Sequence, residues 1–494
     1  MTPPRHRPAG GRRLERRLAA RFDRAQRWAD QRLEATGPAR AALRRAYPDP
    51  WAFLFGEIAL YCLVVLVVTG LFLSVFYVPD VRGQVTYQGP YAPLRGQPVT
   101  EAFNSVMRIS FEVPAGLLVR QTHHWASLVF VAAIVLHLCR IFFTGAFRRP
   151  RERTWVVGIA VLLLAMAQGL AGHSLPDDLL SGMSLQIVWS AVLAIPVIGP
   201  EVAYLLFGGE FPSPEAIPRL FVLHTMLLPA LLVGLLAVHL GTVVRHRRHP
   251  GPGRGEGAAA GARRRPERAL ASLSLLLLVA AVLALLGGVA QINPVWQLGP
   301  YHPAHVTSPA QPDWYLAFLD GLVRLAPPWG FELFGWTISE LLWPALLFPA
   351  VAFGILTLWP WIERRLGGDR AEHQLLDRPR DAPLRSAVGA AGLTMFLVAF
   401  VAAGNDVLAV LLHLPLEAVT RLLQWSFVLG PVVVGLVTYA VCRSLRRSGL
   451  HPAGSAVGPR LERTAAGGYR SAPAEPRRRS RPRGVSAAGE PGRG

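Results

Sequence analysis

Long apolar runs alternate with polar or charged segments over most of the chain, and this alternation recurs eight times. A helix needs roughly 20 predominantly apolar residues to cross the hydrocarbon core of a bilayer. The pattern therefore predicts an all-α polytopic membrane protein with eight transmembrane helices. The expected helices lie near residues 51–78, 125–146, 155–175, 220–244, 269–291, 339–362, 386–413 and 421–442.

The composition is consistent with this pattern only if charge and apolar residues are segregated. The 494 residues are 52% hydrophobic, with a mean hydropathy of +0.33, yet the formal net charge is +20. Residues 1–50 carry thirteen arginines and the loop 245–268 carries eight, whereas residues 176–218 hold five acids and no arginine. Cytoplasmic loops of membrane proteins are enriched in basic residues. The distribution predicts that both termini are cytoplasmic, and it argues against nucleic-acid binding.

Composition also divides the chain into five segments. Residues 1–47 are an Arg-rich cytoplasmic surface segment, and residues 48–250 form a first domain of four transmembrane helices. Residues 251–268 are a flexible Gly/Ala/Arg linker. Residues 269–445 form a second domain of four helices, and residues 446–494 are a basic tail expected to be disordered.

Histidines inside two of the apolar runs provide the first chemical signal. Ionisable groups in membrane helices are costly and indicate function. His123 and His137 are fourteen residues apart, so on a helix they share one face and lie about 21 Å apart along the axis. His124 lies well off that face, and Trp125 beside it suggests a place at the membrane–water interface.

A second apolar run carries His224 and His239, which are fifteen residues apart. This spacing is slightly too long for one face, and we expect a kink at Pro229 to absorb the extra residue. Four imidazoles at two depths then form two bis-histidine sites. Haem suits such sites because it is flat and takes one axial imidazole from each side, whereas zinc prefers a compact tetrahedral cluster.

Glycines and arginines occur at matching places. Two other runs each carry a pair of glycines fourteen residues apart, where a missing side chain lets a bulky ring approach the backbone. Three arginines lie three to five residues from a paired histidine, near a membrane edge where a haem propionate would emerge. The alternatives are helix packing for the glycines and lipid contact for the arginines. The residues are Gly56, Gly70, Gly158, Gly172, Arg120, Arg140 and Arg219.

With these motifs, the chain resembles the cytochrome b subunit of quinol–cytochrome c oxidoreductases, especially the actinobacterial branch. The resemblance extends from about residue 48 to 445. It rests on the histidine pairs, the four glycines, and the stretches GHSLPDDLLSG, IPRLFVLH, QPDWY and ERRLGGDRAEHQLLDRPRD.

The resemblance implies two b haems and a bacterial plasma membrane location. His123 and His224 would be the axial ligands of the haem nearer the outer face. His137 and His239 would be those of the haem nearer the cytoplasm. The three arginines match positions that hold propionates. The first domain would be a di-haem four-helix bundle, and segment 182–198 would form short helices over the outer site.

The resemblance also implies the reaction. Asp313 and Tyr315 belong to a PDWY motif that matches the family's Pro-Glu-Trp-Tyr motif, whose acid contacts quinol at the outer oxidation site. Quinol, with menaquinol expected for this branch, would give one electron to a Rieske iron–sulfur protein. The other would pass through both haems to a quinone near the cytoplasm, with proton translocation. An aspartate before a helix is also an ordinary N-cap, and that alternative stays open.

The sequence has no cysteine motif for the iron–sulfur and c-type haem centres that the resemblance implies, so we expect partner subunits to carry them. Its three cysteines, Cys62, Cys139 and Cys442, form no CxxC or CxxCH pair, so the iron–sulfur and c-type haem centres must be elsewhere. The expected partners are a Rieske protein, a cytochrome c subunit, a terminal cytochrome c oxidase and a second copy of the complex. No nucleic-acid partner is expected.

The chain departs from the family pattern at two places. His173 stands where relatives usually carry Tyr, and Val244 stands where other branches have a histidine, with His246 two residues further on. Asp177 and Asp178 fit the branch, but could simply cap the following helix. The alternatives to a cytochrome b are a di-haem anchor of another quinone-linked oxidoreductase and a haemless transporter or scaffold.

Overall fold

The computed structural model describes most of the chain between residues 54 and 447. The described residues are 54–246, 265–305, 311–368, 371–373 and 376–447, together with two short strands at 460–463 and 469–472. The predicted surface segment 1–47 and most of the predicted linker lie outside the described residues. The orientation of the two termini therefore remains a prediction.

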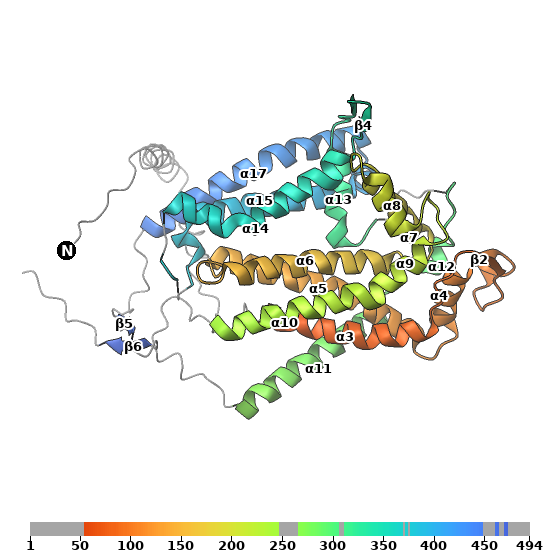
Figure 1. Ribbon diagram of the computed structural model, residues 1–494, viewed down its shortest axis with the longest axis horizontal. Coiled ribbons are helices and arrows are strands. Elements are labelled where there is room, and N and C mark those ends of the chain that lie inside the picture. Colours follow the sequence, from red (N-terminus) through yellow and green to blue (C-terminus); the bar gives the residue numbers. More distant parts are fainter. Residues whose placement is uncertain are drawn as a thin grey trace, which may run out of the picture.

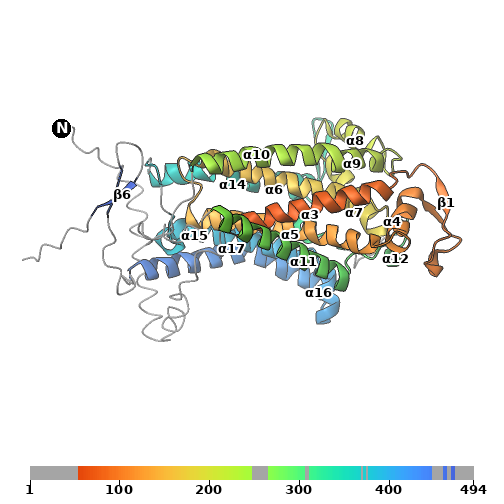
Figure 2. The same cartoon turned by 90° about the horizontal axis from the view of Figure 1, so that it is seen from below.

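Within the described residues, eight helices are long and apolar enough to cross a membrane, which confirms the predicted number. They run side by side along a common direction in both views of the molecule (Figures 1 and 2). Their bounds are α3 Phe55–Phe76, α5 Gly116–Thr144, α6 Glu152–His173, α9 Ala216–Val222 with η3 Leu223–Leu227 and α10 Leu228–His246, α11 Arg265–Val289, η5 Leu342–Leu347 with α14 Phe348–Gly367, α15 Pro383–Ala402 and α17 Leu416–Arg447.

Shorter elements gather at one end of the bundle, at the right of Figure 1. This end carries the acid-rich loops and is the predicted outer face. The helices there are η2 Ala92–Leu94, α4 Glu101–Phe111, α7 Leu179–Leu193, α8 Gly199–Phe207, α12 Val295–Leu298, α13 Trp314–Leu325 and α16 Asn405–Leu412. Two hairpins accompany them, in which β1 Gln84–Thr86 pairs with β2 Pro98–Thr100 and β3 Phe331–Leu333 pairs with β4 Trp336–Ile338, both antiparallel.

Two further elements lie on other connections. The one-turn η6 Pro379–Asp381 precedes α15. In the C-terminal tail, β5 Arg460–Arg463 and β6 Tyr469–Ala472 form an antiparallel pair with Arg460 opposite Ala472. The sequence predicted disorder throughout this tail, so the strand pair is a departure for those eight residues. The rest of the tail lies outside the described residues.

The seventh apolar run is split, whereas the sequence predicted one span over 386–413. Helix α15 ends at Ala402, and the separate helix α16 begins at Asn405. The Asn405 side chain accepts a hydrogen bond from Arg324 Nη1 at 2.8 Å and donates one to Thr420 Oγ1 at 2.9 Å. These bonds tie the break to α13 and α17. The apolar composition of α16 concealed the break in the sequence.

Helix α5 is the centre of the molecule. It packs against α3, α6 and α11, while α10 packs against α6. Small and branched side chains of α5, among them Ala126 and Val131, are fully buried in the main core beside Cys62 of α3. Helices α13, α15 and α17 pack together as the second group. The two groups meet along α5, α6, α13 and α14.

A buried ionic cluster joins the two groups at the end opposite the short helices. The Arg385 side chain is 3% exposed, and its Nε donates to both oxygens of Glu363 at 3.0 and 3.1 Å. Its Nη1 donates to Asp377 at 3.0 Å, and Asp377 also lies 2.8 Å from Arg148 Nη2. The guanidinium lies over the Phe147 ring. Arg148 and Phe147 follow α5, so the cluster fixes α14 and α15 to the first group.

We expect Arg385→Met to lower the free energy of unfolding by about 3 kcal/mol, because two carboxylates lose the buried cation that compensates them. The matched control is Arg421→Met, since Arg421 pairs with Glu417 on a surface where their side chains are 70% and 74% exposed. That change should cost about 0.5 kcal/mol or less. Thermal unfolding of both purified variants measures the difference, and equal melting temperatures would contradict the assigned role of the cluster.

Candidate functional site

The four predicted ligand histidines meet in two pairs, in which His123 and His137 of α5 face His224 of η3 and His239 of α10. The ring centroids of His123 and His224 are 6.2 Å apart, with the rings tilted by 72°. Those of His137 and His239 are 6.5 Å apart and tilted by 73°. The two pairs lie at different depths, as the fourteen-residue spacing on α5 predicted.

These separations match the space that a six-coordinate iron needs. A metal–imidazole bond of about 2.0 Å on each side, added to the distance from nitrogen to ring centre, places two axial imidazole centroids about 6.3 Å apart. The two facing pairs with this separation are those that the sequence predicted as ligands. The residues present therefore fit a haem at both levels.

The spacing of fifteen residues between His224 and His239 is one residue longer than four helical turns. The sequence predicted that a kink at Pro229 would compensate for it, and the structure shows a wider helical turn instead. Leu223–Leu227 form a turn of π-helix, which contains His224 and ends just before Pro229. A π-helix accommodates one more residue per turn than expected for an α-helix, and it often marks a functional site. Pro229 lacks an N–H, so the preceding carbonyls have no α-helical partner at that position. The wide turn, rather than a kink by itself, brings both histidines to one face.

Hydrogen bonds at the outer pair orient the rings. The Thr69 hydroxyl donates to Val65 O at 2.7 Å, so at 2.8 Å it accepts from Nδ1 of His123. His224 Nδ1 donates to Gln168 O at 2.9 Å. Both rings thus keep a proton on Nδ1 and leave Nε2 free to bind a metal. Sequence reasoning missed Thr69 and Gln168, because their partners lie on other helices.

The four predicted glycines each face one of these imidazoles. A Cβ added at Gly172 would lie within 3.0 Å of ring atoms of His224, closer than real Cβ contacts. The other three positions are less crowded. An added Cβ would lie 3.1 Å from His123 Cε1 at Gly70, 3.2 Å from His137 Cε1 at Gly56 and 3.7 Å from His239 Cε1 at Gly158. The glycines make room for the ligand rings, which brings α3 close to α5 and α6 close to α10.

A cavity of about 260 Å³ occupies the inner level. Gly56, His137, Gly158 and His239 line it, and Arg140 is among the other lining residues. Its walls are mostly apolar, from α3, α5, α6 and α10. An apolar cavity with two facing imidazoles and a peripheral cation has the features of a haem pocket.

The other two predicted propionate arginines differ in their surroundings. Arg120 lies over the Trp296 ring, and its buried Nε and Nη2 atoms have no hydrogen-bond partner among the described residues. Two buried guanidinium donors without an acceptor call for an anionic group. Arg219 instead donates from Nη1 to the carbonyls of Tyr204 and Leu205, both at 2.7 Å, at the end of α8. Nη1 of Arg219 is therefore already hydrogen-bonded to the backbone, and only the other guanidinium nitrogens could bind a propionate.

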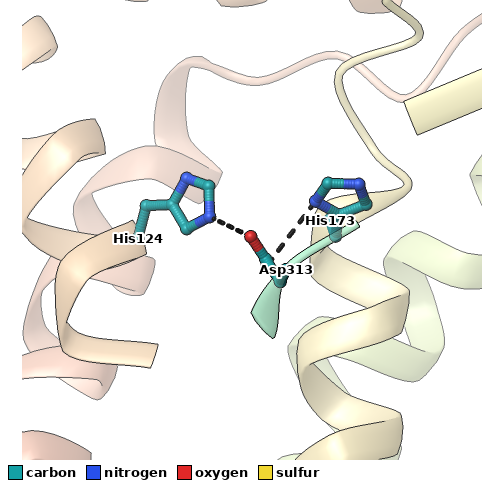
Figure 3. Close-up of side chains that lie close together, drawn as sticks. All are labelled: His124, His173 and Asp313. Atoms are coloured by element: carbon teal, nitrogen blue, oxygen red, sulfur yellow. Dashed lines mark hydrogen bonds and ion pairs between the residues drawn. The ribbon is translucent and has the colours of Figure 1, made fainter. Parts of the chain in front are cut away.

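Asp313 lies between two further histidines at the outer end of the bundle (Figure 3). His124 Nε2 donates to Asp313 Oδ1 at 2.9 Å, and His173 Nδ1 lies 3.6 Å from Oδ2. The Tyr315 hydroxyl also donates to Oδ2, at 3.1 Å. His124 is thus bound to a carboxylate of the second group of helices instead of simply marking the interface.

The Asp313 carboxylate does not cap α13. Asp313 is the N-cap residue of this helix, but its side chain makes no capping hydrogen bond. Burial opposes ionisation of the carboxyl, yet the bond from His124, the charge of both imidazoles and the Tyr315 hydroxyl lower its pKa to about 2. The ordinary N-cap explanation therefore does not account for its environment. Gly169 of α6, which the sequence did not single out, leaves space for the Tyr315 hydroxyl.

The two acids after α6 have separate roles. Asp178 caps α7 in a reciprocal arrangement with Ser181. Asp177 accepts a hydrogen bond from Thr100 Oγ1 at 2.6 Å, and burial raises its pKa to about 7. The predicted segment 182–198 forms most of α7, which ends at Leu193. The side chains of Val244 and His246 lie outside the described part of α10.

Comparisons with known proteins give a consistent result. Residues 128–300 match the family model described as cytochrome b(N-terminal)/b6/petB. The chain is 46% identical over 422 residues to the cytochrome bc1 complex cytochrome b subunit of Mycobacterium tuberculosis, which covers 85% of this chain and 76% of that protein. It is 41% identical over 428 residues to the subunit of the same name from Streptomyces coelicolor, covering 86% and 78%.

A solved structure of a hyperthermophilic respiratory complex III contains a chain with the same fold, with a TM-score of 0.54 at 20% identity. The match covers 83% of this chain and 99% of that chain. Sequence identity over most of the chain distinguishes this family from the di-haem anchors and haemless transporters that the sequence had left open. The chain belongs to the family of cytochrome b subunits of actinobacterial bc1 complexes, which are quinol–cytochrome c oxidoreductases, and it is a multi-pass protein of the bacterial plasma membrane.

Proposed function

We propose that this subunit oxidises quinol beside Asp313 at the outer face. One electron would pass to a quinone near the cytoplasm, with His123, His224, His137 and His239 holding two b haems that supply one-electron carriers, and the other would pass to a Rieske protein. The observation that carries the proposal is the pair of imidazole separations of 6.2 and 6.5 Å at two depths, each in the range expected for two axial ligands. Proton release at the outer face accompanies the reaction and couples it to proton translocation.

The chain's own residues would hold both haems. His123 and His224 would bind the outer one, and His137 and His239 the inner one. When bound, the haems supply one-electron carriers at two levels of the membrane. Arg120 offers buried, unpartnered donors for a propionate of the outer haem, and Arg140 lies at the edge of the inner cavity. Arg219 would use its remaining donor atoms.

Asp313 is the proposed proton acceptor for quinol oxidation. A general base must be ionised and within hydrogen-bond reach of the substrate hydroxyl. The lowered pKa of Asp313 keeps its carboxylate ionised at physiological pH. A weakly basic carboxylate also releases a proton readily, which suits transfer towards the outer surface. Tyr315 orients the carboxylate through its bond to Oδ2.

Other centres must come from partner subunits. Cys62, Cys139 and Cys442 are unpaired, and no two of them form a motif for iron–sulfur or c-type haem. A Rieske protein and a cytochrome c subunit would supply these centres, and a terminal cytochrome c oxidase would accept the electrons. Menaquinol as substrate and a dimeric complex rest on the family resemblance.

His123→Ala should remove the outer haem and leave the inner haem bound, because only the outer pair loses a ligand. The reciprocal change, His137→Ala, should remove the inner haem. A dithionite-reduced minus oxidised spectrum with haem counting per chain tests both variants. Retention of two haems in His123→Ala would refute the ligand assignment.

Gly172→Ala and Gly158→Ala form a matched pair on α6. The first should reduce outer haem occupancy by at least about half, because the added methyl group would displace the His224 ring. The second should leave both haems in place, since its methyl group reaches only ordinary contact at 3.7 Å. Alanine in a helix is otherwise favoured over glycine by about 1 kcal/mol. Equal haem counts in the two variants would contradict the close packing at Gly172.

Asp313→Asn should leave both haems bound and slow quinol oxidation by about 100-fold, the usual scale for loss of a general base. The control is Asp313→Glu, which restores a carboxylate and should recover most of the activity. Stopped-flow reduction of the b haems by quinol measures the step directly. An unchanged rate in Asp313→Asn would assign Asp313 a purely structural role.

A further inference from the structure

The hairpin of β3 and β4, on the connection between α13 and η5, has one apolar face and one polar face. Residues opposite each other on the two strands form two apolar pairs with a polar pair between them. The pairs are Phe331 with Ile338, Leu333 with Trp336, and Glu332 with Thr337. Successive side chains of a strand point to opposite faces, so the two apolar pairs share one face and the polar pair occupies the other.

The apolar face of the hairpin is only partly covered by the chain itself. Ile338 is 8% exposed, whereas Leu333 and Trp336 are 47% and 48% exposed. A two-stranded hairpin is marginally stable in water and needs its apolar face packed against something else. The exposed half of this face therefore indicates a contact with an apolar partner outside the chain.

The turn between the strands displays a phenylalanine in a strained conformation. Phe334 has a φ of +51° and Gly335 a φ of +80°, both in the left-handed region. Turns with this backbone favour Asn-Gly or Asp-Gly, and a bulky side chain at a positive φ is unfavourable. The Phe334 side chain is 93% exposed. Strain at a position that presents an aromatic ring to the surroundings suggests that the ring serves a contact.

The hairpin lies at the level where a membrane span begins. Trp343 is the second residue of the span Leu342–Gly367, and its Nε1 donates to Trp329 O at 2.7 Å. The Phe331 ring stacks on the Trp343 ring, with centroids 6.2 Å apart and 30° between the planes. Figure 1 shows β4 at the end of the bundle that carries the short helices, projecting to the side of the spans.

The apolar face of the hairpin continues a stripe of exposed apolar residues along α14. These residues recur every three or four positions and therefore lie on one side of the helix. They are Leu347, Val351, Ile355 and Leu358. Trp343 precedes the stripe by four residues, so the stripe leads to the ring on which Phe331 stacks. A stripe of this kind on a membrane span faces lipid, and aromatic side chains are enriched where such a stripe meets the headgroups.

We propose that the β3–β4 hairpin binds the lipid surface and lies in the headgroup region of the bilayer. The apolar face and the Phe334 ring would point toward the acyl chains, and Glu332 and Thr337 toward water. Amphipathic elements at this interface bury their apolar face about 5–10 Å into the boundary between headgroups and acyl chains. Transfer of the Phe334 ring out of water would offset the strain of the turn. The hairpin would thereby fix the depth of the chain that follows α13.

The test places nitroxide labels on single introduced cysteines in the intact purified complex, reconstituted into phosphatidylcholine nanodiscs. Oxygen concentrates among acyl chains and a nickel chelate stays in water, so the ratio of their collision rates with the label reports its surroundings. Leu333→Cys and Phe334→Cys sample the apolar side, and Thr337→Cys on the polar face of the same hairpin is the matched control. Val351→Cys on α14 is the lipid reference, and His302→Cys on an exposed loop is the water reference.

We expect the oxygen-to-nickel ratio at Leu333 and Phe334 to exceed the ratio at Thr337 by at least about threefold, because only the apolar face enters the acyl boundary. The ratio at both positions should approach that at Val351. The labelled unaltered complex gives the background from native cysteines, and haem counts confirm that each variant folds.

Low collision rates with both reagents at Leu333 and Phe334 would show that another protein subunit covers the face, and would overturn the proposal. A nickel collision rate equal to that at His302 would place the hairpin in water and would also overturn it. Equal ratios at Leu333 and Thr337 would contradict the orientation of the two faces. The proposal does not depend on the role of Asp313, so the Asp313→Asn result neither supports nor weakens it.

Discussion

The separation of just over 6 Å between facing imidazoles of α5 and α10 is the constraint on which the first group of helices depends. It suits an iron between two nitrogens. Helices α5 and α10 must therefore stand apart at both levels, and the contacts that hold the group together come from other pairs. Helix α3 packs closely on α5, and α6 packs closely on α10.

This division explains where the glycines and the π-helical turn occur. The close pairs must leave room for the ligand rings, and glycine provides it at Gly70 and Gly56 on α3 and at Gly172 on α6. The turn at Leu223–Leu227 corrects the register of α10 so that both of its histidines face α5. Glycines and a π-helical turn would destabilise an ordinary helix bundle. Here both allow the imidazoles of facing helices to lie just over 6 Å apart.

The proposed quinol-oxidising site depends on the second group of helices being fixed against the first. Asp313 precedes α13, whereas His124 and His173 belong to α5 and α6. The distance of 2.9 Å between His124 and Asp313 requires α13 to dock firmly on the first group of helices. The Arg385 cluster ties the two groups together at the opposite end. A carboxylate held ionised between two imidazoles is consistent with the proposed proton acceptance.

The sequence by itself determined the features that depend on one helix at a time. The number of spans follows from the length of each apolar run, and the two depths follow from the fourteen residues between His123 and His137, because helical geometry is local. The tertiary structure decided which side chains of different helices face each other. His124 and Asp313 are 189 residues apart in the chain, and no periodicity relates them. The break before Asn405 was hidden for the same reason, since the hydrogen bonds that hold Asn405 come from Arg324 of α13 and Thr420 of α17. The extra residue near Pro229 was visible in the sequence, but its form as a π-helical turn was not.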